Sequence, residues 1–313
     1  MSNKLSKKIP NLSRIGLGTV QFGIDYGFSK ALDQSDVNKI LEAAYENNVR
    51  FLDTAREYGN SEDKIKTYCR QNPQRSGFCV ATKFSIIEDK TILNWDYMTR
   101  NHLRESLKES MIALGKNYLP LVFVHQTDAD VMNNPEFWEA LAQIKDNPWA
   151  SSFGISVYDP KVTKEIIEKR GDLIDCIQAP YNVFNRQFES LIELLKEKKI
   201  GFISRSTFLK GALVEDKIPE ELRGLEPVRK RLKEISKKSG FTVPQLLTLF
   251  ALHAKFIDCT LIGVRSADQL RENLGFRKYL DESPEQFLKI KEELLNLPEV
   301  DDFLKDPRQW ELQ

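Results

Sequence analysis

The chain has 313 residues, and its 46 lysines and arginines are balanced by 46 aspartates and glutamates. This balance gives no electrostatic reason to expect a nucleic-acid or membrane partner. No apolar run approaches the roughly 18 residues of a membrane-spanning helix, and no apolar stretch follows the basic start, so we expect neither a membrane anchor nor a signal peptide. The four cysteines are widely spaced, which favours reduced thiols in a cytoplasmic protein over disulfides or a metal site.

Short apolar runs alternate with amphipathic patterns along the chain, after a stretch at residues 9–18 that has room for a small N-terminal β-hairpin. The predicted strands are Ile15–Thr19, Val49–Asp53, Phe78–Lys83, Leu119–His125, Ser152–Ser156, Ile174–Gln178, Ile200–Ser204 and Cys259–Gly263. The predicted helices are Ser35–Asn48, Glu62–Gln71, Met98–Leu114, Pro135–Lys145, one that begins at Pro160 and ends at Gly171, Phe188–Lys198, Pro227–Lys238, Val243–Ala254, Ala267–Leu274 and an extra C-terminal helix at Ser283–Leu295. This alternation is typical of a (β/α)8 TIM barrel, and we expect one such domain over residues 1–313.

Three successive predicted strands end in side chains that can do chemistry. Asp53 ends the second strand and Tyr58 follows it in the next loop, Lys83 ends the third strand, and His125 ends the fourth. Each alone would be an ordinary loop, surface or structural residue. Because the loops after parallel barrel strands converge on one face, where the active sites of such barrels lie, we expect the four side chains to meet there.

The set resembles the aldo/keto reductase family, whose catalytic tetrad is Asp, Tyr, Lys and His in this order. The resemblance rests on the stretch DTAREYGNSE at residues 53–62, on the strand-end Lys83, on the segment Gln178–Asn182 and on motifs at most other strand ends. It implies reduction of a carbonyl by a nicotinamide cofactor. Tyr58 would then be the general acid, Lys83 would lower the Tyr58 pKa, Asp53 would anchor Lys83, and His125 would orient the substrate.

The same resemblance implies the cofactor site. Ser156 and Gln178 would hold the nicotinamide amide, although Val157 stands where the family usually has Asn, and Arg205 stands where an aromatic residue usually stacks on the ring. The other implied contacts are Gly18, Thr19 and Asp53 near the first two strands, Ser206, Leu209 and Gly211 at the pyrophosphate, and Gly263, Arg265, Gln269 and Asn273 at the adenosine phosphate. Arg265, at the start of a helix, favours NADP over NAD, and NAD stays open.

The substrate is predicted less sharply. Gln126 replaces a frequent Trp, which together with Arg205 suggests a polar aldehyde or ketone, sugar-derived or acidic, and Phe22 would form an aromatic wall. We expect this small molecule to be the main partner of a monomer or small homo-oligomer. Two alternatives remain: a cofactor-binding regulatory subunit with little turnover, and a lyase that uses Lys83 in a Schiff base.

Overall fold

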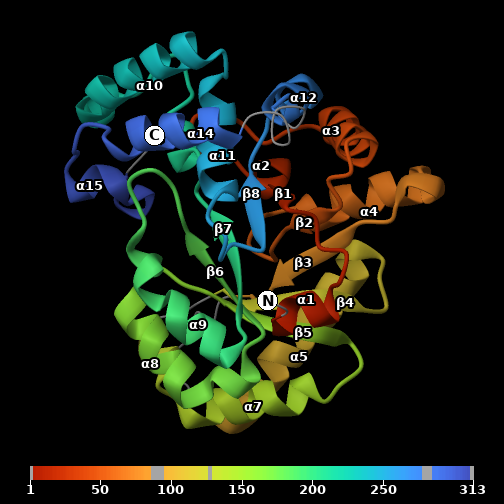
Figure 1. The fold of residues 1–313 in the computed structure, drawn as a ribbon. Coiled ribbons are helices and arrows are strands. Elements are labelled where there is room, and N and C mark those ends of the chain that lie inside the picture. The colour runs from red at the N-terminus through yellow and green to blue at the C-terminus, as the bar shows by residue number, and fades with distance from the viewer. Residues whose placement is uncertain (1–2, 86–94, 126–128, 277–283, 311–313) are drawn as a thin grey trace.

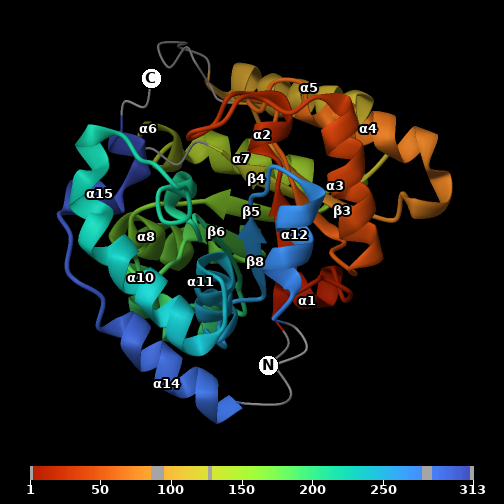
Figure 2. The same ribbon diagram turned by 90° about the horizontal axis from the view of Figure 1, so that it is seen from above.

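The computed structural model describes residues 3–85, 95–125, 129–276 and 284–310. Eight parallel strands form a closed barrel in the order β1 to β8, and helices surround it (Figures 1 and 2). The strands are β1 (Ile15–Gly18), β2 (Phe51–Asp53), β3 (Cys79–Lys83), β4 (Leu119–Val124), β5 (Ala150–Ser156), β6 (Cys176–Pro180), β7 (Gly201–Arg205) and β8 (Cys259–Ile262). The (β/α)8 barrel predicted from the sequence is therefore confirmed, with strand bounds shifted by one or two residues.

The longer helices around the barrel lie near their predicted positions, whereas the short helices at Val20–Gly23 and Ala129–Met132 were not predicted. These helices are α2 (Val20–Gly23), α3 (Gln34–Glu46), α4 (Ser61–Gln71), α5 (Trp95–Leu114), α6 (Ala129–Met132), α7 (Pro135–Lys145), α8 (Pro160–Arg170), α9 (Ile192–Lys198), α10 (Glu226–Ser239), α11 (Val243–Leu252) and α12 (Ala267–Leu274). Several begin at local capping contacts; for example, the Asp159 carboxylate accepts from the amides of Lys161 and Val162. No helix in the described ranges is long and apolar enough to cross a membrane.

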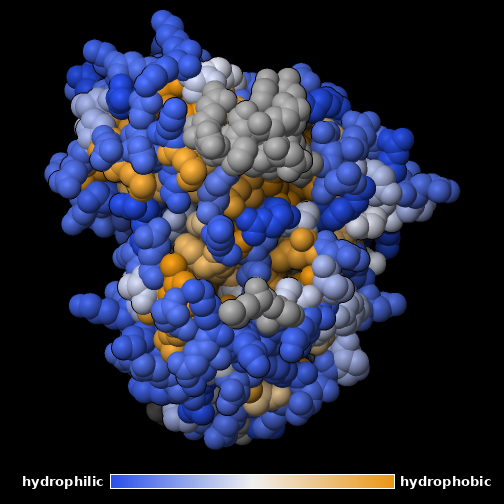
Figure 3. All heavy atoms as spheres, in the orientation of Figure 1, coloured by the Kyte–Doolittle hydropathy of each residue, from blue (hydrophilic) through white to orange (hydrophobic). Residues whose placement is uncertain are grey.

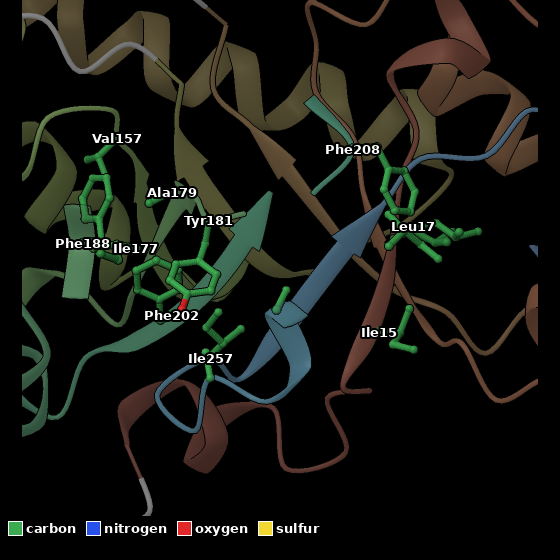
Figure 4. Packing of buried hydrophobic residues seen from close by; sticks show 14 of the residues in the cluster. Ile15, Leu17, Val157, Ile177, Ala179, Tyr181, Phe188, Phe202, Phe208 and Ile257 are labelled. Atoms are coloured by element: carbon green, nitrogen blue, oxygen red, sulfur yellow. The ribbon is translucent and has the colours of Figure 1, made fainter. Parts of the chain in front are cut away.

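Strand residues alternate between two apolar layers. The outward layer packs under the helices and includes Leu17, Ile177 and Phe202 (Figure 4). The inward layer fills the barrel and contains Phe51, Ala81, Leu121, Phe123, Cys176, Ile203, Cys259 and Leu261. Gly16 makes room for this filling, because a Cβ there would lie 2.7 Å from the Phe51 ring.

The N-terminal hairpin prediction is wrong. A short helix, α1 (Lys4–Lys8), stands before β1 instead, because Asn3 and Ser6 form a reciprocal capping box at its start. Leu5 on α1 is fully buried, and a Cβ on Gly201 would lie 2.7 Å from the Leu5 Cβ. The helix thus closes the barrel at the end where the strands begin. Figure 3 shows this face of the molecule as mostly hydrophilic, with hydrophobic residues between its upper and lower parts.

The predicted extra helix is present as α14 (Pro284–Leu295), and the chain continues through α15 (Asp302–Lys305) into a short 3₁₀ turn, η6 (Pro307–Gln309). The Nζ of Lys210 donates to the Pro307 carbonyl at 2.7 Å. Since Lys210 follows β7, this contact brings the end of the chain to the barrel face on which the strands end.

Candidate active site

The predicted catalytic side chains occupy inward positions at the carboxyl ends of their strands. The interior residues Phe51, Ala81 and Phe123 are followed two positions later by Asp53, Lys83 and His125. Because strand side chains alternate with a period of two, the same alternation that fills the barrel with apolar groups places these three polar groups above them. All three line one cavity together with Tyr58.

Lys83 is the centre of the hydrogen-bonded cluster. Its Nζ donates to the Asp53 Oδ2 at 2.8 Å, to the Thr54 carbonyl at 2.9 Å and to the Tyr58 hydroxyl at 3.2 Å. The side chains of Lys83 and Asp53 are 1% and 5% exposed. The other carboxylate oxygen, Oδ1, accepts from the Gln178 amide at 2.7 Å, and Gln178 belongs to β6 on the opposite side of the barrel. Every ammonium hydrogen of Lys83 therefore has a partner.

Burial and charge act against each other on the pKa values of this cluster. Burial lowers the pKa of Lys83, but Asp53 and Tyr58 raise it more, so the pKa lies above its ordinary value and the ammonium stays charged. Burial raises the pKa of Tyr58, Lys83 lowers it, and the net shift is upward. The expected lowering by Lys83 is thus present but outweighed, and the phenol keeps its proton at neutral pH.

His125 is held beside the phenol in its neutral form. Its ring centroid lies 6.0 Å from that of Tyr58 at an interplanar angle of 84°. Burial, together with the positive charges of Lys83 and Arg205, lowers the pKa of His125 to about 3. Its Nδ1 is buried and has no hydrogen-bond partner in the described part of the chain.

Two glycines fix the loop that carries Tyr58. Gly59 has a φ of +55°, and a Cβ on Gly23 would lie only 1.8 Å from the Tyr58 carbonyl oxygen. Side chains at either position would force the loop apart. Thr19 supports the neighbouring strand, since its hydroxyl donates to the Asp53 carbonyl at 2.9 Å.

The cavity has a volume of about 600 Å³, within the usual range for small-molecule sites. It brings together the predicted cofactor residues Gly18, Thr19, Asp53, Ser156, Gln178, Arg205, Ser206, Gly211, Gly263, Arg265, Gln269 and Asn273. Leu209 differs, because its side chain is fully buried in the core and its amide donates to the Ser206 carbonyl at 3.1 Å. The Gly211 amide likewise donates within the turn, to the Phe208 carbonyl at 3.0 Å.

The start of α12 fits a phosphate. Ser266 caps the helix by accepting from the Gln269 amide at 3.1 Å, and Arg265 stands just before it. The Arg265 guanidinium bridges two other loops, donating to the Glu215 carboxylate at 2.9 Å and to the Ser29 hydroxyl at 3.1 Å. These residues can hold the phosphates of a dinucleotide.

The sequence did not reveal all of the residues that line the cavity. Tyr158 and Arg308 line the cavity, although neither follows a strand directly, so no strand-end signal pointed to them. Phe22, expected as an aromatic wall, is a core residue that is 1% exposed. Gln126 and the neighbouring residues 127–128 lie outside the described residues, as do residues 86–94 of another expected substrate loop.

The fold and this site together define a (β/α)8 barrel with a buried, hydrogen-bonded cluster of Asp53, Lys83 and Tyr58 beside a neutral His125. The sequence profile of the Aldo/keto reductase family matches residues 14–294, so the chain belongs to this family, and it is an oxidoreductase. It is also similar to a protein of Bacillus subtilis (strain 168) described as "Uncharacterized oxidoreductase YqkF", with 28% identity over 286 residues, which cover 87% of this chain and 89% of the relative.

Proposed function

We propose that the protein reduces an aldehyde or ketone to the alcohol with NADPH, with Tyr58 as the general acid. The observation that carries the proposal is the direction of the hydrogen bond at 3.2 Å from Lys83 to Tyr58. Because Lys83 donates to the phenol oxygen, the Tyr58 proton remains available for a substrate oxygen. A bound nicotinamide would supply the hydride.

The raised pKa of Tyr58 fits the reductive direction. A phenol that holds its proton at neutral pH can act as an acid, whereas oxidation of the alcohol would require it to accept one. The neutral His125 can donate a hydrogen bond to the same substrate oxygen and orient it.

The raised pKa of Lys83 argues against the Schiff-base lyase. A lysine must lose its proton before it can attack a carbonyl, and the ammonium of Lys83 is stabilised by Asp53 and occupied by three acceptors. Borohydride should therefore fail to trap a carbonyl substrate on Lys83.

The first experiment is a fluorescence titration with NADPH and NADH, followed by a panel of carbonyl substrates. The Tyr58→Phe variant should lose activity by about 100-fold or more while its affinity for NADPH stays within about threefold of the parent. Absence of binding by either cofactor would refute the proposal. Saturable binding without turnover of any carbonyl would instead favour the regulatory cofactor-binding role.

Arg265 carries the preference for NADPH over NADH in this proposal, because its charge can meet the additional phosphate. Arg265→Gln should reduce the ratio of the two affinities by about tenfold. Arg271→Gln provides the control, since Arg271 lies on α12, the helix that Arg265 precedes, but pairs with Asp268 and Glu46 on the surface. Equal effects of the two substitutions would remove Arg265 from this role.

A further inference from the structure

Arg205 is the last residue of β7, and several contacts fix the position of its guanidinium group. Its guanidinium carbon stands 4.0 Å from the centroid of the Tyr158 ring, and its Nη2 donates to the Val157 carbonyl at 3.0 Å. The Ser206 hydroxyl accepts a longer contact of 3.4 Å from Nη1. A guanidinium has five N–H groups, so these contacts leave its Nε–H and others for a ligand.

A second arginine reaches the same ring from the far end of the chain. The guanidinium carbon of Arg308, on η6, lies 3.9 Å from the centroid of the Tyr158 ring. Its Nε donates to the Asp306 Oδ1 at 2.8 Å, which orients the group while its Nη1 makes none of these contacts. Both arginines line the cavity that contains Tyr58. The Tyr158 ring thus contacts two guanidinium groups, those of Arg205 and Arg308, which lie about a hundred residues apart in the chain.

The charges of the cavity are unevenly compensated. Lys83 is paired with Asp53, Arg265 with Glu215 and Arg308 with Asp306. Among the described residues, no carboxylate forms an ion pair with Arg205 or with Lys210, which also lines the cavity. The cavity therefore carries excess positive charge, even though Glu272 also lines it.

This charge acts close to the reacting groups. Arg205 is among the causes that lower the pKa of His125 and oppose the rise in the pKa of Tyr58, so its field reaches both side chains that would hold the substrate oxygen. An anionic group on that substrate would meet guanidinium donors, which suit carboxylates and phosphates in geometry as well as charge.

We propose that Arg205 and Arg308, both stacked on Tyr158, bind an anionic group of the substrate, so that the protein acts on carbonyl compounds that carry a carboxylate or a phosphate. This inference rests on the proposed reductase function. It assigns Arg205 to the substrate rather than to stacking on the nicotinamide.

The test compares substrates that differ only in charge. The ratio of kcat/KM values for 4-formylbenzoate over 4-formylbenzamide, and for the corresponding 3-isomers, should exceed about tenfold in the parent protein. Glyceraldehyde 3-phosphate against glyceraldehyde tests phosphate in the same way and shows which anion is preferred. A ratio near one for every pair would overturn the proposal.

Variants then locate the anion. Arg308→Gln and Arg205→Gln should each lower the charged-to-neutral ratio by about tenfold, whereas Arg231→Gln, which breaks surface pairs with Glu234 and Glu293, should leave it unchanged. Arg205→Gln should also keep the Kd for NADPH within about threefold. A weakened NADPH affinity with an unchanged ratio would assign Arg205 to the cofactor and overturn the proposal.

An equilibrium measurement separates this proposal from the reductase function itself. The Tyr58→Phe protein, saturated with NADPH, is titrated calorimetrically with 4-formylbenzoate and 4-formylbenzamide. Tighter binding of the carboxylate, lost in Arg308→Gln, supports the anion site even if the parent protein turns over no carbonyl. Equal affinities overturn the anion site even if the parent protein is an active reductase.

Discussion

The buried pair of Asp53 and Lys83 makes a quantitative prediction about stability. Asp53→Asn keeps the shape of the side chain but removes its charge, leaving the Lys83 ammonium, 1% exposed, without a counter-ion. Breaking a buried pair in this way usually costs about 3–5 kcal/mol. Lys83 in the variant can also become neutral by losing its proton, which limits the loss of stability. Because pH 7 lies 3.5 units below the ordinary lysine pKa of 10.5, deprotonation costs about 1.4 kcal/mol per unit, and the loss has an upper limit of about 5 kcal/mol.

Urea unfolding, followed by circular dichroism, measures this loss. The loss should shrink as the pH rises from 7 to 10, because removing the proton from Lys83 in the folded variant costs less free energy as the pH approaches the ordinary lysine pKa of 10.5, which holds in the unfolded chain. The parent protein, whose Lys83 pKa is raised, keeps its contribution until the pH passes that pKa. Glu168→Gln is the control: its pair with Lys164 is exposed, so the loss should stay below about 1 kcal/mol. If Asp53→Asn also lost less than about 1 kcal/mol, independently of pH, the conclusion that Asp53 and Lys83 form a buried ion pair would be refuted.

Three further predictions follow from the geometry. Gly23→Ala should sharply reduce turnover, because its Cβ would displace the Tyr58 carbonyl at 1.8 Å, whereas Gly77→Ala, with nothing within 4 Å of the added Cβ, should not; equal activities would contradict the close approach. The parent protein should lose stability as the pH falls, because the pKa of His125 is about 3 in the folded protein and about 6.5 in the unfolded chain, which costs about 1.4 kcal/mol per pH unit between these values. His125→Gln should remove this part of the pH dependence. Superimposable urea titrations of the parent and the variant from pH 4 to 7 would count against the buried neutral ring. Leu5→Ala should lower the unfolding free energy by about 2–5 kcal/mol and leave kcat unchanged at 25 °C, and a stability loss below 1 kcal/mol would mean that α1 does not close the barrel.

The barrel was predictable because its signals are local. The helices predicted at Pro135–Lys145 and Ala267–Leu274 have the bounds found in the structure, since an Asn or Ser cap and an apolar stripe lie within each segment. The α1 helix has a local cap at Asn3, but it is only five residues long and has no apolar stripe, and Leu5 packs against Gly201, far away in the sequence.

The site divides in the same way. Asp53, Lys83 and His125 could be placed from strand alternation alone, but the approach of Arg308 to Tyr158 depends on how the end of the chain crosses the barrel face. Lys83 lowers the pKa of Tyr58, as its adjacency predicted, but the stronger and opposite effect of burial depends on the whole cavity and could not be foreseen from the sequence.

The hydrogen bond between Gln178 and Asp53 has a consequence for how the barrel can diversify. The four residues of the predicted tetrad all come from β2 to β4 and the loops after them, while Ser156, Gln178, Arg205 and Arg265 come from the second half of the barrel. Among the side-chain contacts that the Asp53 carboxylate makes with the described residues, only the one from Gln178 crosses between the halves. We therefore expect sequence changes in the second half of the barrel to be compatible with the position of the Asp53 carboxylate as long as an amide is retained at position 178.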